Sequence, residues 1–256
     1  MINPLYPLSG FAVGMLVGLT GVGGGSLMTP VLVLLFGIHP ATAVGTDLLY
    51  ASVTKTAGTV VHGLSDTVDW RVVGRLISGS IPATALTVFL LHFLGAPEGV
   101  ARLVSVVLAA ALTLTAVCLM LRKYILAFAA SRFGELPARR VAALTVTTGV
   151  VLGVLVAISS VGAGAIGVTA LLLLYPRLPT ARIVGSDIAH AVPLTLVAGI
   201  GHWLIGSVNW GLLGSLLIGS IPGIIVGSYA SARVPDAVLR PVLATTLVVV
   251  ASKLVM

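Results

Sequence analysis

The chain contains the same hydrophobic segment twice. Residues 45–82 and 185–222 align at a constant offset of 140, and each copy carries one aspartate, Asp47 or Asp187. The other shared residues are Gly45/Gly185, His62/His202, Trp70/Trp210 and Gly79-Ser80-Ile81-Pro82/Gly219-Ser220-Ile221-Pro222. At an offset of 139, a glycine-rich break also recurs, as Gly21-Val22-Gly23-Gly24-Gly25 and Ser160-Val161-Gly162-Ala163-Gly164. Duplicated, glycine-interrupted hydrophobic segments are typical of transporters, so the two breaks are where we expect a binding site.

The composition places the chain in a lipid bilayer. Hydrophobic residues make up 58% of it and charged residues only 8%, against about 25% charged residues in soluble domains. The length of 256 residues leaves room for roughly ten spans or part-spans and for no soluble domain. The net charge of +7 predicts contact with anionic lipids. Nucleic acid is excluded as a partner, because the basic residues do not cluster on a soluble module. A single cysteine, Cys118, excludes a multi-cysteine metal site, and we expect no metal and no cofactor.

The apolar segments predict the same architecture in both halves of the chain. They cover residues 5–20, 26–37, 41–62, 71–94, 101–121, 141–158, 165–175, 181–205, 211–231 and 238–255. Each half therefore has two short pieces around a glycine break, followed by three full spans. This pattern predicts an all-α polytopic membrane protein with a first repeat over residues 1–125, a basic linker over 126–140 and a second repeat over 141–256.

The distribution of basic residues predicts that the second repeat is inverted. If each pair of short pieces is a hairpin and the Arg122–Arg140 linker is cytoplasmic, only Arg102 and Lys253 lie outside. The basic residues inside are then Arg71, Arg75, Arg122, Lys123, Arg132, Arg139, Arg140, Arg177, Arg182, Arg233 and Arg240. If each pair is a single crossing, the last four move outside and Lys253 moves inside. The positive-inside rule favours the hairpins, and hence inverted repeats.

The glycine breaks are candidate anion sites. Non-helical backbone at membrane depth is tolerated where it lines a cavity or is buried in protein, and a helix that starts within the membrane directs free N–H groups and its positive dipole end into the break. Close packing of helices through small residues would also explain the glycines. The predicted substrate-binding residues at the breaks are Thr20, Gly23, Gly24, Gly25, Ser26, Ser159, Gly162, Ala163, Gly164 and Ala165.

Lys55 is the second candidate. It lies about 15 residues into its predicted span, roughly 22 Å along a helix, which is too deep for its ammonium to reach the interface easily. A lysine at that depth is a functional hypothesis by default. It could offset the charge of an anionic substrate or form a structural ion pair with Asp47. The second copy has Thr195 at this position, so the two halves differ here.

The repeated aspartates and histidines form a third group. Asp47 and Asp187 could each orient a glycine hairpin by accepting backbone N–H bonds. They could instead couple transport to protons, and His190, on the same helix face as Asp187, makes that pair the better candidate for a relay. We prefer the architectural role, because an ionised carboxylate would repel an anion. His62 and His202 are further candidates for gating or proton coupling, although histidines near span ends are often interface residues.

The run GLTGVGGGSLMTPVLVLLFGIHPATAVGTDL resembles the opening of the TauE/SafE sulfite-exporter family of membrane proteins. The second break and its following Gly-Ser-Asp resemble the repeat of that family, with Ala163 and Ala165 where a fuller match would have glycine and serine-like residues. The resemblance implies a transporter of sulfite, organosulfonates or related small anions in a bacterial or archaeal plasma membrane.

The sequence therefore predicts a transporter and not an enzyme, most simply an exporter of a small sulfur oxyanion that works by alternating access between inverted repeats. An anion channel on the same scaffold is an alternative. A third class, an intramembrane aspartyl protease, would need Asp47 and Asp187 to converge. The exact anion, the coupling ion and a homo-oligomeric state are left open at this point.

Overall fold

In the residues that the structure describes, the chain is helical throughout and contains no strand. The structure, a computed structural model, describes residues 4–20, 25–64, 67–93, 97–132 and 137–231. The helices are α1 (Leu5–Thr20), α2 (Gly25–Leu34), α3 (Pro40–Leu64), α4 (Trp70–Phe93), α5 (Pro97–Arg132), α6 (Ala138–Ser159), α7 (Ala165–Leu174), α8 (Thr180–Leu204) and α9 (Trp210–Ser231). The last predicted span, residues 238–255, lies outside the described residues.

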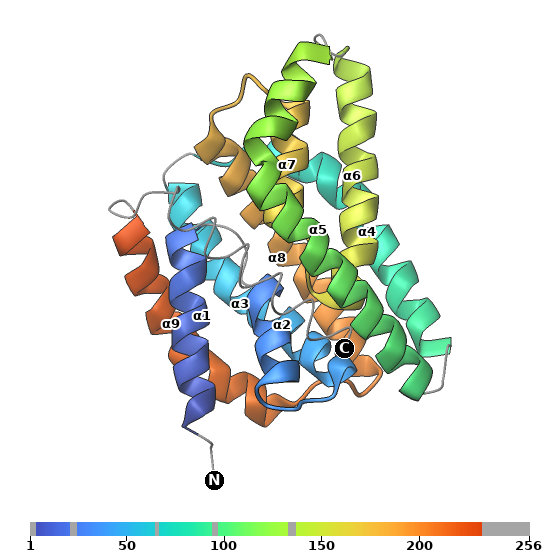
Figure 1. Cartoon of the computed structure of the whole chain (residues 1–256), viewed down its shortest axis with the longest axis vertical. Coiled ribbons are helices and arrows are strands. Elements are labelled where there is room, and N and C mark those ends of the chain that lie inside the picture. Colours follow the sequence, from blue (N-terminus) through green and yellow to red (C-terminus); the bar gives the residue numbers. More distant parts are fainter. Residues whose placement is uncertain (1–3, 21–24, 65–66, 94–96, 133–136, 232–256) are drawn as a thin grey trace.

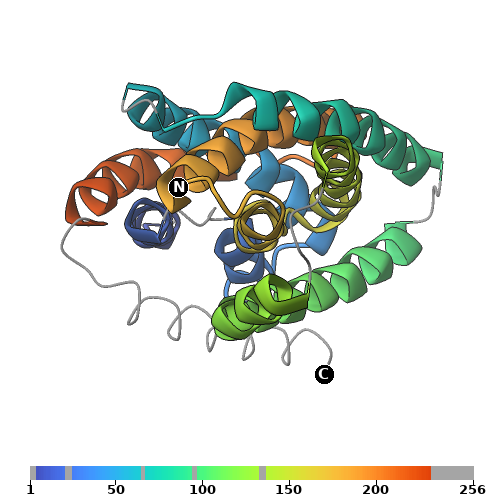
Figure 2. The ribbon, with the colours of Figure 1, turned by 90° about the horizontal axis from the view of Figure 1, so that it is seen from above.

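The short helices α2 and α7 lie inside the bundle (Figures 1 and 2). Seen from above, α3, α4 and α8 lie along one face of the bundle and α5 along the opposite face (Figure 2). The helices α2 and α7 lie between these faces, where α2 packs against α3 and α7 against both α5 and α8. The two helices that follow the glycine breaks are therefore surrounded by longer helices.

Two helix pairs cross through glycines that contact backbone. In the pair α1–α9, a Cβ atom added to Gly219 would lie 1.8 Å from the Pro7 carbonyl oxygen, and one added to Gly10 would lie 2.2 Å from the Leu216 carbonyl oxygen. The pair α4–α6 has the same contacts, since an added Cβ on Gly149 would lie 2.3 Å from the Leu76 carbonyl oxygen. Small residues spaced four apart allow two helix backbones to approach in this way in a membrane.

These crossing contacts repeat between the two halves of the chain. The contact of Gly10 with Leu216 corresponds, at offsets of 139 and 140, to the contact of Gly149 with Leu76. The loop contacts repeat as well. The Asn209 N–H donates to the Thr46 hydroxyl at 3.1 Å, and the Asp69 N–H donates to the Ser186 hydroxyl at 2.8 Å. Each half of the chain thus makes the same contacts with the other half.

The helices α3 and α8 pack against each other in opposite directions. Near the start of α3, Gly45 lies against His202 at the end of α8, and Leu49, one turn further along α3, lies against Gly199. At the other end, Gly185 of α8 lies against Thr67, which follows α3. These two helices carry the repeated aspartates, so both carboxylates lie on the central helix pair.

Five helices are long and apolar enough to cross a membrane, judged by length and composition in the described part of the chain: α4, residues 101–122 of α5, α6, α8 and residues 210–227 of α9. The helix α6, predicted as a short piece, is one of these five. The helix α3, predicted as a full span, has 25 residues but is not among them, because Asp47, Lys55 and several threonines lower its hydropathy.

Most of the predicted Arg122–Arg140 linker is helical. The helix α5 continues to Arg132 and α6 begins at Ala138. Between Arg122 and Arg132 the chain contains neither glycine nor proline, so nothing in that stretch stops the helix. The next residues that interrupt a helix are Gly134 and Pro137, which lie between the two observed helices. The basic linker predicted over residues 126–140 is therefore helical at both of its ends.

Candidate functional site

The second glycine break forms a sharp reversal between α6 and α7. Ser160 ends α6 in the left-handed conformation with φ of 59°, and Gly162 and Gly164 have φ of 132° and 126°. L-residues rarely adopt such φ values, which glycine adopts without cost. The helix α7 begins at Ala165 without a side-chain cap, so its first N–H groups face the break and need partners from elsewhere in the fold.

Asp187 of α8 occupies the start of α7. The backbone N–H of Gly164 lies beside its carboxylate. The carboxylate also packs directly on Gly167, where an added Cβ atom would lie 2.1 Å from Asp187 Oδ1. Asp187 is 1% exposed. A buried carboxylate of the protein itself is thus bound at the helix end that the sequence suggested for a substrate anion.

Asp47 of α3 binds α2, the short helix after the first break, in a similar way. Both the backbone N–H and the hydroxyl of Thr29, in α2, donate to Asp47 Oδ2. The Ser160 hydroxyl, from the other hairpin, lies beside the same carboxylate but without a hydrogen bond of full geometry. Asp47 is fully buried. It therefore meets α2 through direct hydrogen bonds and faces the second break as well.

Lys55 interacts with both carboxylates. Lys55 is 4% exposed, and the charges of Asp187 and Asp47 both act on its ammonium. Each aspartate contacts a different short helix, Asp47 contacting α2 and Asp187 contacting α7, and the lysine lies within the electrostatic reach of both. These three groups connect the two short helices α2 and α7 through one buried cluster of charges, which we call the Asp-Lys-Asp cluster (Asp47, Lys55, Asp187).

Several buried polar atoms around this cluster have no hydrogen-bond partner within the described part of the chain. They are Asp47 Oδ1, Asp187 Oδ1, Ser160 Oγ, His190 Nδ1 and Ser220 Oγ. Buried polar atoms in native proteins nearly always have partners, and unpaired ones indicate water, an ion or a ligand. Ser160 lies beside Asp47, and the charge of Lys55 acts on His190, so these atoms lie near the cluster. The cluster therefore has unused capacity to bind a polar solute.

The histidines lie differently from what the sequence suggested. His190 Nε2 pairs with the Ser80 hydroxyl of α4 at 2.9 Å, and its other nitrogen has no described partner. His202 is 1% exposed, and its Nε2 bonds the Ala157 carbonyl at 2.8 Å. The expectation of an interface position for His202 is therefore wrong, because α8 passes next to α6 at this level. The side chain of His62 lies outside the described residues.

The remaining predicted residues divide into three groups. The Ser159 hydroxyl donates to the Leu155 carbonyl at 2.7 Å, so its proton is used within its own helix. Ala163 and Ala165 are buried at 8% and 5% exposure and line the second break. Gly23, Gly24 and the side chains of Thr20 and Ser26 lie outside the described residues, and Gly25 is the first residue of α2.

Sequence reasoning missed Thr29 and Gly167. Both lie in the first half of the short helix after a break, Thr29 in α2 and Gly167 in α7. The signal was present, because a polar hydroxyl and an additional glycine interrupt otherwise apolar helices there. This signal identifies Thr29 and Gly167 as site residues only when it is also known that the aspartates of α3 and α8 face the starts of α2 and α7.

We expect Gly167→Ala to slow transport. The added methyl group would lie 2.1 Å from Asp187 Oδ1 and 3.2 Å from its Cγ, so the carboxylate must turn away from the start of α7. A polar interaction with a charged group contributes about 1.5–3 kcal/mol, and the loss of the interaction between Asp187 and the start of α7 therefore predicts a loss of tenfold or more in initial flux. Gly74→Ala is the matched control, since nothing lies within 4 Å of its added Cβ. Equal flux in the two variants would contradict this role of Asp187.

Comparison with known proteins shows the family of the chain. Residues 6–254 match the family model described as "Sulfite exporter TauE/SafE". The chain is 39% identical over 250 residues to "Probable membrane transporter protein YjnA" of Bacillus subtilis (strain 168), covering 97% of this chain and 98% of that protein. It is 27% identical over 216 residues to "Probable membrane transporter protein YdhB" of the same organism, covering 79% and 80% of the two chains. No solved structure matches. The chain is thus an integral membrane protein and belongs to the TauE/SafE family of sulfite exporters.

Proposed function

We propose that this membrane transporter carries a small sulfur oxyanion, such as sulfite or an organosulfonate, out of the cell. The observation that carries the proposal is the buried Asp-Lys-Asp cluster, in which the charges of two aspartates act on Lys55 and each aspartate contacts a different short helix, α2 or α7. A lysine buried at membrane depth among unpaired polar atoms suits a compact anion. The printed family name, which refers to sulfite, supports the choice of substrate.

The contacts between the halves support inverted repeats. In parallel repeats, α3 and α8 would point in the same direction, because they occupy equivalent places in the two halves. Their contacts instead run in opposite directions, from Gly45 with His202 to Gly185 with Thr67. The reciprocal glycine contacts of α1–α9 and α4–α6 fit the same pseudo-two-fold relation. Such a relation, with the site between the repeats, is common among secondary transporters.

Charge balance suggests how binding could drive alternating access. With all three groups ionised, the Asp-Lys-Asp cluster carries one net negative charge, so an arriving anion must compete with a carboxylate for Lys55. A carboxylate that loses its interaction with Lys55 holds its short helix less firmly, since Asp47 binds Thr29 of α2 and Asp187 packs on Gly167 of α7. Binding of the anion would in this way loosen one hairpin and allow the site to open on the other side.

The membrane potential favours the proposed direction. A potential negative inside drives a monoanion outward with about 2.3 kcal/mol per 100 mV, and a dianion with about twice that. Export could therefore proceed without a coupling ion. Residues Arg122–Arg140 would lie on the cytoplasmic side of the plasma membrane, in agreement with the positive-inside rule.

The test is flux in proteoliposomes that contain the full chain. Sulfite, sulfate, thiosulfate and a small sulfonate are each followed under a set membrane potential, with and without a pH gradient. We expect saturable flux of sulfite or the sulfonate and acceleration by the same anion on the opposite side, as for a carrier. Rapid flux without counterflow would instead indicate an anion channel. Absence of flux for all four anions would contradict the proposed substrate class.

A further inference from the structure

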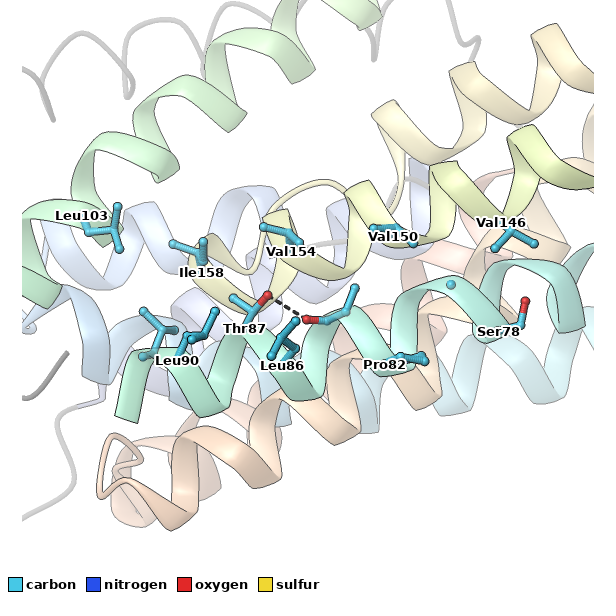
Figure 3. A pocket seen from close by; sticks show the side chains of 13 residues that line it. Ser78, Pro82, Leu86, Thr87, Leu90, Leu103, Val146, Val150, Val154 and Ile158 are labelled. Carbon is cyan, nitrogen blue, oxygen red and sulfur yellow. Dashed lines mark hydrogen bonds between the residues drawn. The ribbon is translucent and has the colours of Figure 1, made fainter. Parts of the chain in front are cut away.

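An apolar groove that contains no residue of the Asp-Lys-Asp cluster lies on the outside of the helix pair α4–α6. Its volume is about 580 Å³. It is lined by Ser78, Gly79, Pro82, Ala83, Leu86, Thr87, Leu90 and Leu91 of α4, Leu103 of α5, and Val146, Val150, Val154 and Ile158 of α6. Figure 3 shows the labelled side chains of α4 and α6 facing each other along the groove.

The groove opens to the outside of the bundle. Leu86 is 58% exposed, Leu90 52% and Val150 41%. The lining runs from Ser78 to Leu91, which is about 20 Å along a helix. One leaflet of a bilayer has a hydrocarbon thickness of roughly 15 Å. The groove therefore has the length and polarity to hold one acyl chain.

Arginines continue the groove at one end. On α4, Arg71 and Arg75 share a helix face with Ser78, Pro82 and Leu86, because successive members are three or four residues apart. On α6, Arg139 lies seven residues, or about two turns, before Val146 and therefore on the same face as the groove residues Val146, Val150, Val154 and Ile158, which are four residues apart. The contacts of Leu76 with Gly149 and of Ser80 with Gly153 make the two helices parallel. The arginines therefore lie at the same end of the groove.

These arginines are suited to a phosphate. Arg71 and Arg139 are exposed and lie near the starts of α4 and α6, where the helix dipoles also favour an anion. Arg75 donates to the Tyr175 hydroxyl at 3.0 Å, so its guanidinium is held in place. The one described carboxylate nearby, Asp69, accepts the backbone N–H groups of Arg71 and Val72 as the cap of α4.

The equivalent position in the second half of the chain has no arginine. At the offset of 140, Arg71 corresponds to Gly211 and Arg75 to Ser215 on α9. The helix α1, which pairs with α9 as α6 pairs with α4, contains no basic residue. Of the two helix pairs, only α4–α6 therefore has arginines at one end of its groove face, although α1–α9 packs in the same way.

We propose that the α4–α6 groove is a binding site for one anionic glycerophospholipid, with an acyl chain along the apolar groove and the phosphate at Arg71 and Arg139. A lipid held in this way differs from the general lipid layer, because its binding depends on two named charges and on the free volume beside Val154.

Native mass spectrometry of the purified full chain tests the site, with phosphatidylglycerol and phosphatidylcholine of identical acyl chains as probes. We expect the wild type to prefer phosphatidylglycerol. Each arginine near a phosphate contributes about 1 kcal/mol, or roughly fivefold in affinity. Arg71→Gln combined with Arg139→Gln should therefore remove about 25-fold of that preference. Arg102→Gln, at an exposed arginine near the opposite end of α4 and α6, is the matched charge control and should change nothing.

A second pair of variants tests the acyl chain. Val154→Phe fills the groove without changing charge and should weaken the binding of both lipids. Ile225→Phe changes an exposed apolar residue of α9 outside the groove and should leave both unchanged. If the double arginine variant does not fold, Arg139→Gln alone should give about a fivefold loss.

Three results would overturn the proposal: equal binding of the two lipids by the wild type, an equal effect of Arg102→Gln, or unchanged binding after Val154→Phe. Pairing of two copies through this face in lipid-free detergent would also overturn it.

Discussion

Lys55→Met should reduce sulfite flux by two orders of magnitude or more. Removal of the ammonium leaves Asp47 and Asp187 buried without a compensating cation, and breaking a buried charge pair costs about 3–5 kcal/mol. The substrate anion also loses its counter-charge. The measurement is the initial rate of sulfite flux in proteoliposomes, compared at equal amounts of folded, reconstituted protein.

Three further variants separate transport from stability. Lys55→Arg keeps the charge and should retain partial flux. Thr195→Val changes the equivalent position in the second half, where the hydroxyl bonds only to its own helix, and should have little effect. Lys55→Met combined with Asp187→Asn restores the charge balance, so it should recover thermal stability without recovering flux. If Lys55→Met transported sulfite at the wild-type rate and affinity, the proposed role of Lys55 in the site would be wrong. The family assignment would not be affected.

Gly219→Ala should strongly destabilise the fold. Its added methyl carbon would lie 1.8 Å from the Pro7 carbonyl oxygen and 2.7 Å from the carbonyl carbon. Both atoms are backbone, so the whole helix α1 must move away from α9. Overpacking of this kind costs typically about 1–3 kcal/mol, and more where backbone must shift. The change should appear as a fall in the midpoint of thermal unfolding in detergent.

The chain provides its own control for this prediction. Gly214 lies on the same helix, and nothing lies within 4 Å of its added Cβ, so Gly214→Ala should be neutral or slightly stabilising. The first half repeats the comparison, because an added Cβ on Gly79 would lie 2.1 Å from the Val146 carbonyl oxygen while Gly74 has no neighbour. Similar midpoints for Gly219→Ala and Gly214→Ala would show that α1 and α9 are not packed through this glycine.

Hydropathy located the helices better than it located their ends. The predicted segments 71–94 and 181–205 match α4 and α8 to within one residue at each end, because proline, glycine and polar residues mark the turns there. The end of α5 was missed. Its continuation to Arg132 depends on helix propensity, whereas the apolar pattern reports only the stretch that contacts lipid. Similarly, α3 is long but polar, because its side chains face protein.

The candidate site was predictable in its residues but not in its contacts. The repeat identified the breaks, the aspartates and the lysine, since residues of these kinds are rare in membrane spans. The hydrogen-bond partners of the N–H groups at the starts of α2 and α7 depend on how α3 and α8 pack. The glycine pattern alone does not identify these partners. The N–H groups at the start of α7 could bind either a substrate anion or a carboxylate of the protein. The sequence could not distinguish these two cases, and in the structure Asp187 lies at this helix start.

The glycine crossings also restrict which parts of the transporter can move together. The helix α1 is joined to α9, and α4 to α6, by contacts between backbone atoms that leave no side chain to rearrange. Each pair takes one helix from each half of the sequence, so a motion of one complete half against the other would have to separate both pairs. The rigid units are then the two mixed pairs. We therefore expect conformational change to occur in the Asp-Lys-Asp cluster and in the short helices α2 and α7, as small hinge motions within a fixed frame of long helices.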